Sequence, residues 1–295
     1  MDNTGRSYFY GILAILFWAT IPTAFKLCLA RMEILHMLAI ASVVSAIALF
    51  IIIVVENKLS LLKKNTPADL LHSALLGFVN PFLYYLILLK AYQILPAQVA
   101  QPLNMIWPVI LVFLSVPVLK QRIEKKSFVA LLISFLGVYI ISSQGNIFSP
   151  GHADIRGVLL ATGSSVFWAF YFILNVKDKR EESIKLFLNF MFASFYIILA
   201  LLITGRWPVN LKISAVAPAV YIGLFEMGIT FYLWLKALQL APTTDKISNL
   251  VYLAPFLSLI LVHFVLHEPV FYTTPAGLLL IITGIMIQNR KPRSV

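Results

Sequence analysis

Residues 34–55 read ILHMLAIASVVSAIALFIIIVV, a run without a single Asp, Glu, Lys or Arg. An α-helix rises about 1.5 Å per residue, so about 20 apolar residues cross the roughly 30 Å hydrocarbon core of a bilayer. The length and purity of this run predict a membrane-spanning helix.

Working outward from this run, apolar windows recur along the whole chain. Prolines interrupt the fourth window, at Pro102 and Pro108, and the ninth, at Pro255. Freed backbone carbonyls are tolerated at membrane depth only where they are re-satisfied or line a cavity. The pattern predicts ten transmembrane helices with short connections, over residues 8–27, 34–55, 70–92, 98–119, 127–143, 157–176, 186–204, 215–238, 247–266 and 273–289.

The composition agrees with an all-α polytopic membrane protein. Of the 295 residues, 60% are hydrophobic and 12% are charged, about half the charged fraction of a soluble protein. This excludes an ordinary cytosolic enzyme, a disordered chain and a nucleic-acid-binding domain. The lone Cys28 excludes a disulfide or cysteine-based metal framework, and no cofactor is expected. The expected partners are the lipid bilayer and a small-molecule substrate, with the chain a monomer or homodimer.

The net charge of +11 is interpreted as a topology signal. With the N-terminus inside, 17 of the 23 Lys and Arg residues fall in inner segments. The other six fall in outer segments: Lys26, Arg31, Lys90, Arg156, Arg206 and Lys212. Positive residues concentrate on the cytoplasmic side of a membrane. This predicts a multi-pass protein of the inner (plasma) membrane with both termini in the cytoplasm.

The two halves of the sequence repeat each other. Residues 17–19, Phe-Trp-Ala, recur at 167–169, and residues 89–96 share Leu-Lys-Ala-x-Gln-x-x-Pro with residues 235–242. Pro108 likewise pairs with Pro255 at an offset of 147. Since each half contains five helices, an odd number, the second half enters the membrane inverted. We therefore predict two five-helix repeats, residues 1–145 and 146–295, around a central cavity, as in many secondary transporters.

These motifs, with the ending Leu266-His267-Glu268-Pro269, Gly277 and Gly284, resemble the EamA-type family of the drug/metabolite transporter superfamily. The Glu of that ending is Gln121 in the first half. Residues 104–108 and 165–171 are similar to segments of the family's aromatic amino acid exporters. The resemblance implies substrate–proton exchange or facilitated export through a central cavity.

Glu226 is an acidic residue near the middle of the eighth helix. An ionised acid at midplane costs roughly 2.5–3.5 kcal/mol, so it faces the bundle interior or carries a proton. Its repeat counterpart, 146 positions earlier, is Asn80. We expect Glu226 to couple transport to protons and Asn80 to contribute hydrogen bonds; the alternative is a protonated Glu226 that serves packing alone.

Other polar and aromatic residues recur at helical spacing on the same helices, where they share a face. On the third helix, for example, Asn80, Tyr84 and Ile87 share a face. Such a lining suits a planar or amphipathic solute such as an amino acid. The candidate substrate-binding residues are Trp18, Asn80, Tyr84, Gln101, Asn104, Trp107, Trp168, Tyr171, Asn175, Thr230, Asn249 and Tyr252.

The preferred function is a secondary transporter and exporter of small organic metabolites, with efflux of other drugs or metabolites as the alternative. A rival from another class is an intramembrane metal enzyme, because His263 and His267 are four residues apart and would share a helix face. Their order differs from the H-E-x-x-H motif and a third ligand is not evident. We therefore expect no enzyme and no metal site.

Overall fold

The computed structural model describes residues 3–119, 125–148, 153–207, 212–241 and 249–289. Within these residues every regular element is a helix, and no strand is present. Eight helical segments are long and apolar enough to cross a membrane, and two more, Leu250–Leu266 and Thr273–Ile287, are apolar but shorter. The described chain is thus that of an all-helical, multi-pass membrane protein. Gln121 lies outside the described residues.

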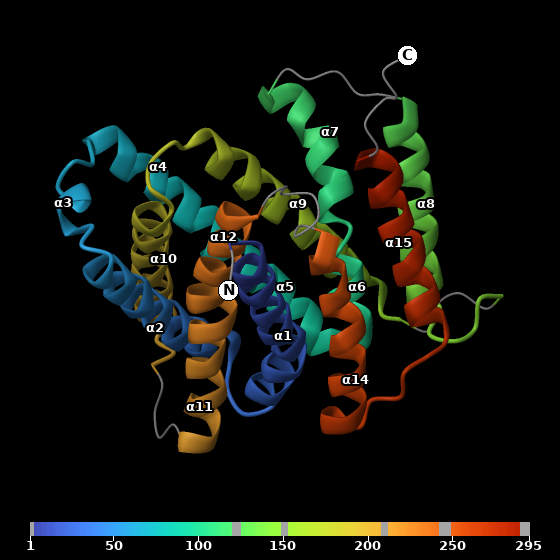
Figure 1. Ribbon diagram of the computed structural model, residues 1–295. Helices are drawn as coiled ribbons and strands as arrows, with labels where there is room; N and C mark the ends of the chain where they lie inside the picture. The colour runs from blue at the N-terminus through green and yellow to red at the C-terminus, as the bar shows by residue number, and fades with distance from the viewer. Residues whose placement is uncertain (1–2, 120–124, 149–152, 208–211, 242–248, 290–295) are drawn as a thin grey trace, which may run out of the picture. The chain divides into compact units, whose positions relative to one another are not determined.

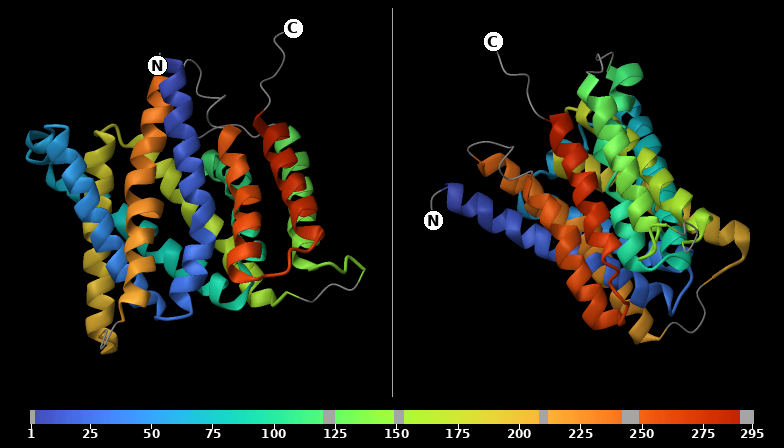
Figure 2. Two further views of the ribbon diagram at one scale, coloured as in Figure 1. Left: turned by 60° about the horizontal axis from the view of Figure 1, so that its bottom comes forward. Right: turned by 90° about the vertical axis from the view of Figure 1, so that its right-hand side faces the viewer.

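The helices form two compact units, each assembled from segments far apart in sequence (Figures 1 and 2). Unit 1 contains Met1–Leu86 and Lys179–His267, and unit 2 contains Ile87–Asp178 and Glu268–Val295. Each unit therefore draws on both halves of the sequence, and the boundary at Leu86 falls inside a helix. The boundaries of the two packed units therefore differ from those of the predicted sequence repeats, residues 1–145 and 146–295.

Unit 1 contains most of the helices. Its elements are α1 (Asn3–Leu29), α2 (Ile34–Val55), α3 (Leu59–Leu62), α4 (Pro67–Gly77), η1 (Phe78–Leu83), the start of α5 (Tyr84–Ile94), α10 (Glu182–Thr204), α11 (Ile213–Ile222), η2 (Gly223–Gly228), α12 (Ile229–Leu240), η3 (Asn249–Leu253) and α14 (Ala254–Leu266). Here α1 packs beside α12 and α14, and α2 packs beside α10. Figure 2 shows α1 and α12 running side by side.

Unit 2 is smaller. It contains the rest of α5, α6 (Ala97–Asn104), α7 (Trp107–Leu119), α8 (Lys125–Ser142), α9 (Ile155–Lys177) and α15 (Thr273–Asn289). The helices α8 and α15 lie against each other (Figure 1). Their glycines permit this close approach, because a Cβ on Gly137 would come within 2.5 Å of the Gly277 carbonyl oxygen.

Local sequence signals set several helix ends. The Thr66 and Asp69 side chains form a reciprocal capping box with Pro67 as the first residue of α4, a combination that satisfies the free amide groups of a helix start. Glu181 accepts from the Ile184 amide at the start of α10, and Gly205 ends that helix with φ of 64°. Glycine suits this left-handed position because it has no Cβ.

Three predicted helices are interrupted in the structure. The fourth divides into α6 and α7 at Met105–Ile106, between Pro102 and Pro108 as the sequence indicated. The third is kinked within η1, where the backbone leaves helical geometry, and the eighth contains a π-helical turn, η2; the sequence analysis anticipated neither. In η1, Asn80 has extended backbone angles (φ −149°, ψ 124°) and precedes Pro81. Single π-helical turns are frequent at functional sites.

Candidate functional site

The acidic residue of the eighth helix lies in the π-helical turn η2 and contacts the third helix. Glu226 is partly buried, and its Oε1 accepts a hydrogen bond of 2.8 Å from the Tyr85 hydroxyl. Tyr85 is 1% exposed and packs edge-on against Phe25 and Tyr84. The Glu226 carboxylate is therefore held in place by a buried phenol from the third helix.

Tyr85 was missed by the sequence analysis, which favoured its neighbour Tyr84. The spacing from Asn80 to Tyr84 assumed a continuous α-helix, and this assumption is wrong. The turn η1 and the extended backbone at Asn80 change the register, so Tyr85 is the residue that reaches Glu226. Tyr84 is also buried, and its ring centroid lies 4.8 Å from that of Tyr85.

Asn80 occupies the corresponding turn of the first half. Its side chain is 2% exposed, and its Oδ1 atom has no hydrogen-bond partner among the residues that the structure describes. A buried amide oxygen without a partner costs roughly 1–3 kcal/mol, so a native structure retains one where it has a use. Asn80 thus presents a buried acceptor inside the kink of the third helix.

The remaining candidates in unit 1 have mixed surroundings. Trp18 packs against Phe231 and Trp234, with ring centroids 5.8 and 5.4 Å away. The Thr230 hydroxyl donates to the Phe225 carbonyl oxygen within η2, which satisfies an acceptor freed by the π-helical turn. Tyr252 is partly buried in η3. Asn249 begins η3, but its side chain lies outside the described ones.

Unit 2 brings a second set of candidates together where α6 ends against α9. Asn104 donates from Nδ2 to the Ser164 hydroxyl at 2.8 Å, and its carbonyl oxygen accepts from the Ser165 hydroxyl at 2.8 Å. Beside this polar pair, the Trp168 ring contacts those of Trp107 and Tyr171, at 6.2 and 6.0 Å. Edge-on and tilted aromatic contacts of this kind are favourable. Gln101 on α6 and Asn175 on α9 are partly buried.

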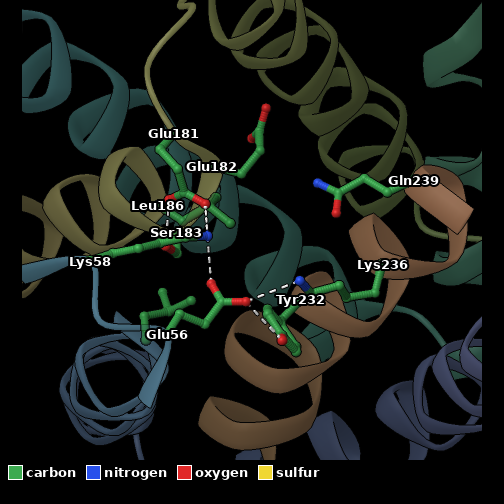
Figure 3. Close-up of a pocket in the computed structure, with 10 residues that line it drawn as sticks. Glu56, Lys58, Glu181, Glu182, Ser183, Leu186, Tyr232, Lys236 and Gln239 are labelled. Carbon is green, nitrogen blue, oxygen red and sulfur yellow. Dashed lines mark hydrogen bonds and ion pairs between the residues drawn. The ribbon is translucent and has the colours of Figure 1, made fainter. Parts of the chain in front are cut away.

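A third cluster, absent from the sequence predictions, surrounds Glu56 directly after α2 (Figure 3). Glu56 accepts from Lys58 at 2.6 Å and from Tyr232 and Lys236 at 3.0 Å each. Lys58 also contacts Glu181 at 2.5 Å. We call these five residues the Glu56 cluster; a pocket beside it is lined by Leu49, Glu182, Ser183, Leu186 and Gln239. Sequence separation hid the cluster, since three distant segments supply it.

The electrostatics of the Glu56 cluster favour its charged form. Partial burial alone would raise the pKa of Glu56, but hydrogen bonds from Lys58, Lys236 and Tyr232 outweigh burial and lower that pKa to about 2. Burial likewise opposes charge on Lys58, yet its hydrogen bonds to Glu181 and Glu56 raise its pKa. The Glu56 carboxylate and the Lys58 ammonium group are therefore both charged near neutral pH, with Tyr232 as a neutral donor beside them.

Glu268, the acidic residue of the motif at residues 266–269, lies at a helix start in unit 2. Its two carboxylate oxygens accept from the backbone amides of Ala97 and Gln98, at 3.2 and 3.4 Å. It therefore caps the start of α6, where a negative charge also complements the helix dipole.

The histidine pair of the rival enzyme hypothesis does not share a helix face. α14 ends at Leu266, and His267 adopts a left-handed conformation with φ of 55°. His263 lies inside the helix and contacts Phe264. Among the described residues, no group of three or more His, Cys, Asp or Glu side chains is placed to hold a metal ion.

Comparisons with known proteins agree with this membrane architecture. An uncharacterized transporter, YvbV of Bacillus subtilis, is 29% identical over 303 residues, which covers 100% of this chain and 94% of that protein. An uncharacterized transporter of Archaeoglobus fulgidus is 27% identical and covers 95% of this chain and 97% of its own length. A solved crystal structure shares the fold with a TM-score of 0.65 at 19% identity, covering 97% of both chains.

The family match spans nearly the whole described chain. The EamA-like transporter family matches residues 5–143 and again residues 155–290. Together with transporter-named relatives that align end to end, this points to transport as the activity and not to catalysis. The chain belongs to the EamA-like transporter family.

Proposed function

We propose that this transporter exports small organic solutes, with amino acids and aromatic or neutral amphipathic compounds favoured, by alternating access coupled to protons. The contact between Tyr85 and Glu226 carries the proposal. Glu226 is an acidic side chain inside a membrane segment, where ionisable residues mark substrate or proton pathways. The Tyr85 phenol stabilises the ionised form of Glu226 by donating a hydrogen bond to it. Protonation of Glu226 removes this charge, which allows the transporter to return through the membrane interior in a neutral state.

The positions of the two irregular segments support the inverted repeat within this proposal. The kinked segment η1 and the π-helical turn η2 begin 145 positions apart, and each follows or begins at a glycine, Gly77 or Gly223. A Cβ on Gly77 would meet the backbone of Asn189 in α10, and a Cβ on Gly223 would meet that of Ala41 in α2. Corresponding helices thus unwind at corresponding places, as expected of two inverted five-helix repeats.

The substrate class follows from the side chains on offer. The candidate residues supply an indole, phenols, amides and hydroxyls, and the partly buried Trp107 and Trp168 present ring surface beside Asn104. Such a lining suits planar or amphipathic solutes. With 17 of the 23 Lys and Arg residues on the predicted inner side, we propose a plasma-membrane protein with cytoplasmic termini, a monomer or a homodimer.

The test begins with the substrate. A thermal-shift screen of the purified protein against amino acids, amines and nucleosides identifies the class, since selective binding stabilises the folded state. Stabilisation by amino acids or aromatic solutes supports the proposal. Stabilisation by nucleosides alone would replace the proposed substrate class.

Coupling is tested with the identified solute in liposomes under an imposed pH gradient. Glu226→Gln should keep the fold and binding but lose the response to the gradient, whereas Glu33→Gln, at an exposed site, should keep it. An unchanged gradient response in folded Glu226→Gln protein would falsify proton coupling through this residue.

A further inference from the structure

The Glu56 cluster joins the end of α2 and the start of α10 to the body of α12 within unit 1. Glu56 directly follows α2, Glu181 caps the start of α10, and Tyr232 and Lys236 lie on α12 (Figure 3). Lys58 bridges the two acids, with its Nζ within 2.6 Å of Glu56 and 2.5 Å of Glu181. One carboxylate therefore accepts from donors on two segments, so its loss would leave Tyr232 and Lys236 without this acceptor and Lys58 with Glu181 alone.

The cluster differs from an ordinary surface ion pair. The Glu56 side chain is 16% exposed, and those of Lys58 and Glu181 are 29% exposed. Partly buried, hydrogen-bonded networks resist solvent screening, and removing one partner leaves the others with uncompensated charge. At the opposite end of α2, Glu33 contacts Arg206 at 3.4 Å with both side chains more than half exposed, a geometry that contributes little.

The helix held by the cluster begins at a non-helical joint. α12 starts at Ile229, immediately after Gly228, whose backbone angles are φ −108° and ψ −92°. Gly228 is buried, and a Cβ there would lie 3.0 Å from the Gly223 carbonyl oxygen. Hinge residues are those at element ends that absorb a change in backbone angles. α12 is thus a 12-residue segment with a joint at one end and ion-paired residues beyond it.

We propose that the Glu56 cluster is a latch that holds α12 at the end of α2, which Lys58 in turn ties to the start of α10, and that α12 pivots at Gly228 when the latch opens. The latch goes beyond the proposed function, and only its place in the transport cycle rests on that function. Leu49 on α2 lies in the pocket beside the cluster and is 1% exposed. Opening the latch would uncover Leu49, which makes this position a reporter.

The experiment measures the labelling rate of a cysteine at position 49 by a maleimide in liposomes. Cys28, the single cysteine, is first replaced by serine, and Leu49→Cys is added. Glu56→Gln in this background should raise the labelling rate about tenfold, the population change that about 1.4 kcal/mol produces. Glu33→Gln, which breaks the exposed pair at the other end of α2, should leave the rate unchanged.

Additional variants separate an open latch from a damaged fold. The exchange Glu56→Lys with Lys236→Glu restores a facing pair and should restore slow labelling. If Glu56→Gln does not purify as a folded protein, Tyr232→Phe, which removes one donor and no charge, should raise the rate by a smaller factor. Equal labelling rates in wild-type, Glu33→Gln and the folded cluster variants would overturn the proposal.

The labelling rate reports the conformation of α12 and does not depend on transport. The latch and the proton coupling can therefore be disproved independently. Faster labelling of Glu56→Gln in a protein that ignores pH gradients keeps the latch and removes the proton coupling. Gradient-driven transport with equal labelling rates keeps the coupling and removes the latch. Because hydrogen bonds outweigh burial and hold the pKa of Glu56 near 2, the latch stays charged over the pH range of such transport assays.

Discussion

The Tyr85 hydroxyl donates a hydrogen bond of 2.8 Å to Glu226, although the two residues are 141 positions apart in sequence. Tyr85 directly follows Tyr84, which begins α5 after the kinked segment η1, and Glu226 lies inside the π-helical turn η2. The contact therefore joins the two interrupted helices of unit 1 at their irregular turns.

Tyr85→Phe should change the pH dependence of transport and lower stability by about 1–2 kcal/mol, because it removes a donor to a charged acceptor. The measurement compares initial transport rates over about pH 5 to pH 8 with unfolding temperatures of the purified protein. Tyr10→Phe on α1 is the matched control and should alter neither. A pH profile of Tyr85→Phe that superimposes on that of the wild type would separate Tyr85 from the coupling step.

The positions of the helices could be predicted from the sequence because a membrane-spanning helix requires a long run of apolar residues. The run 34–55 coincides with α2, and the window 127–143 differs from α8 by one or two residues at each end. The interruption between α6 and α7 could also be predicted, since Pro102 and Pro108 weaken the backbone ladder there.

The kink at η1 and the π-helical turn η2 could not be predicted in this way. An extended residue inside a helix, such as Asn80 in η1, breaks the regular rotation of about 100° per residue, so later side chains no longer follow the spacing of a continuous helix. For this reason Tyr85 occupies the position that regular spacing assigned to Tyr84. Glu226 was found because a charge in an apolar run is conspicuous, whereas Glu56 and Glu181 lie at helix ends, where acids are ordinary, and only folding brings them to Lys58.

Trp168→Ala should weaken binding of the identified solute by at least about tenfold. The expected loss exceeds the roughly 1 kcal/mol of a single aromatic contact, because the substitution also removes the ring that packs against Trp107 and Tyr171. Trp168→Phe should retain part of the affinity, since it keeps an aromatic ring. Leu199→Ala, at a 40% exposed position on α10, is the control. Equal affinities of Trp168→Ala and Leu199→Ala, measured by titration calorimetry, would remove Trp168 from the binding site.

Acidification should erode the stability supplied by Glu56. Hydrogen bonds from Lys58, Lys236 and Tyr232 outweigh burial and lower the pKa of Glu56 from 4.5 to about 2 in the folded protein. A depressed carboxyl pKa stabilises the fold above the unfolded-state value and loses that effect as the pH falls through the folded-state value. The stabilisation, roughly 1–3 kcal/mol, is thus complete above about pH 5 and lost toward pH 2.

The measurement is the difference in unfolding free energy between wild-type and Glu56→Gln protein as a function of pH. Subtracting the variant cancels the other carboxyl groups, so the difference isolates Glu56. It should be constant near neutral pH and shrink as the pH falls below about 5. A difference that stays constant down to the lowest accessible pH would show that the charge of Glu56 contributes nothing.

Gly223→Ala should destabilise the protein by about 1–3 kcal/mol, the usual cost of overpacking. A Cβ at this position would come within 2.5 Å of the Ala41 carbonyl oxygen and 2.9 Å of the Val44 Cβ, so α2 must move away from η2. The matched control is Gly163→Ala in α9, where a Cβ meets nothing within 4 Å. That substitution should be neutral or stabilise by up to about 1 kcal/mol, because alanine favours the helix. The measurement compares the unfolding temperatures of the two variants in the same detergent. If Gly223→Ala is as stable as Gly163→Ala, the close approach of α2 to η2 does not constrain the fold. The correspondence of Gly223 with Gly77 would then no longer support the repeat.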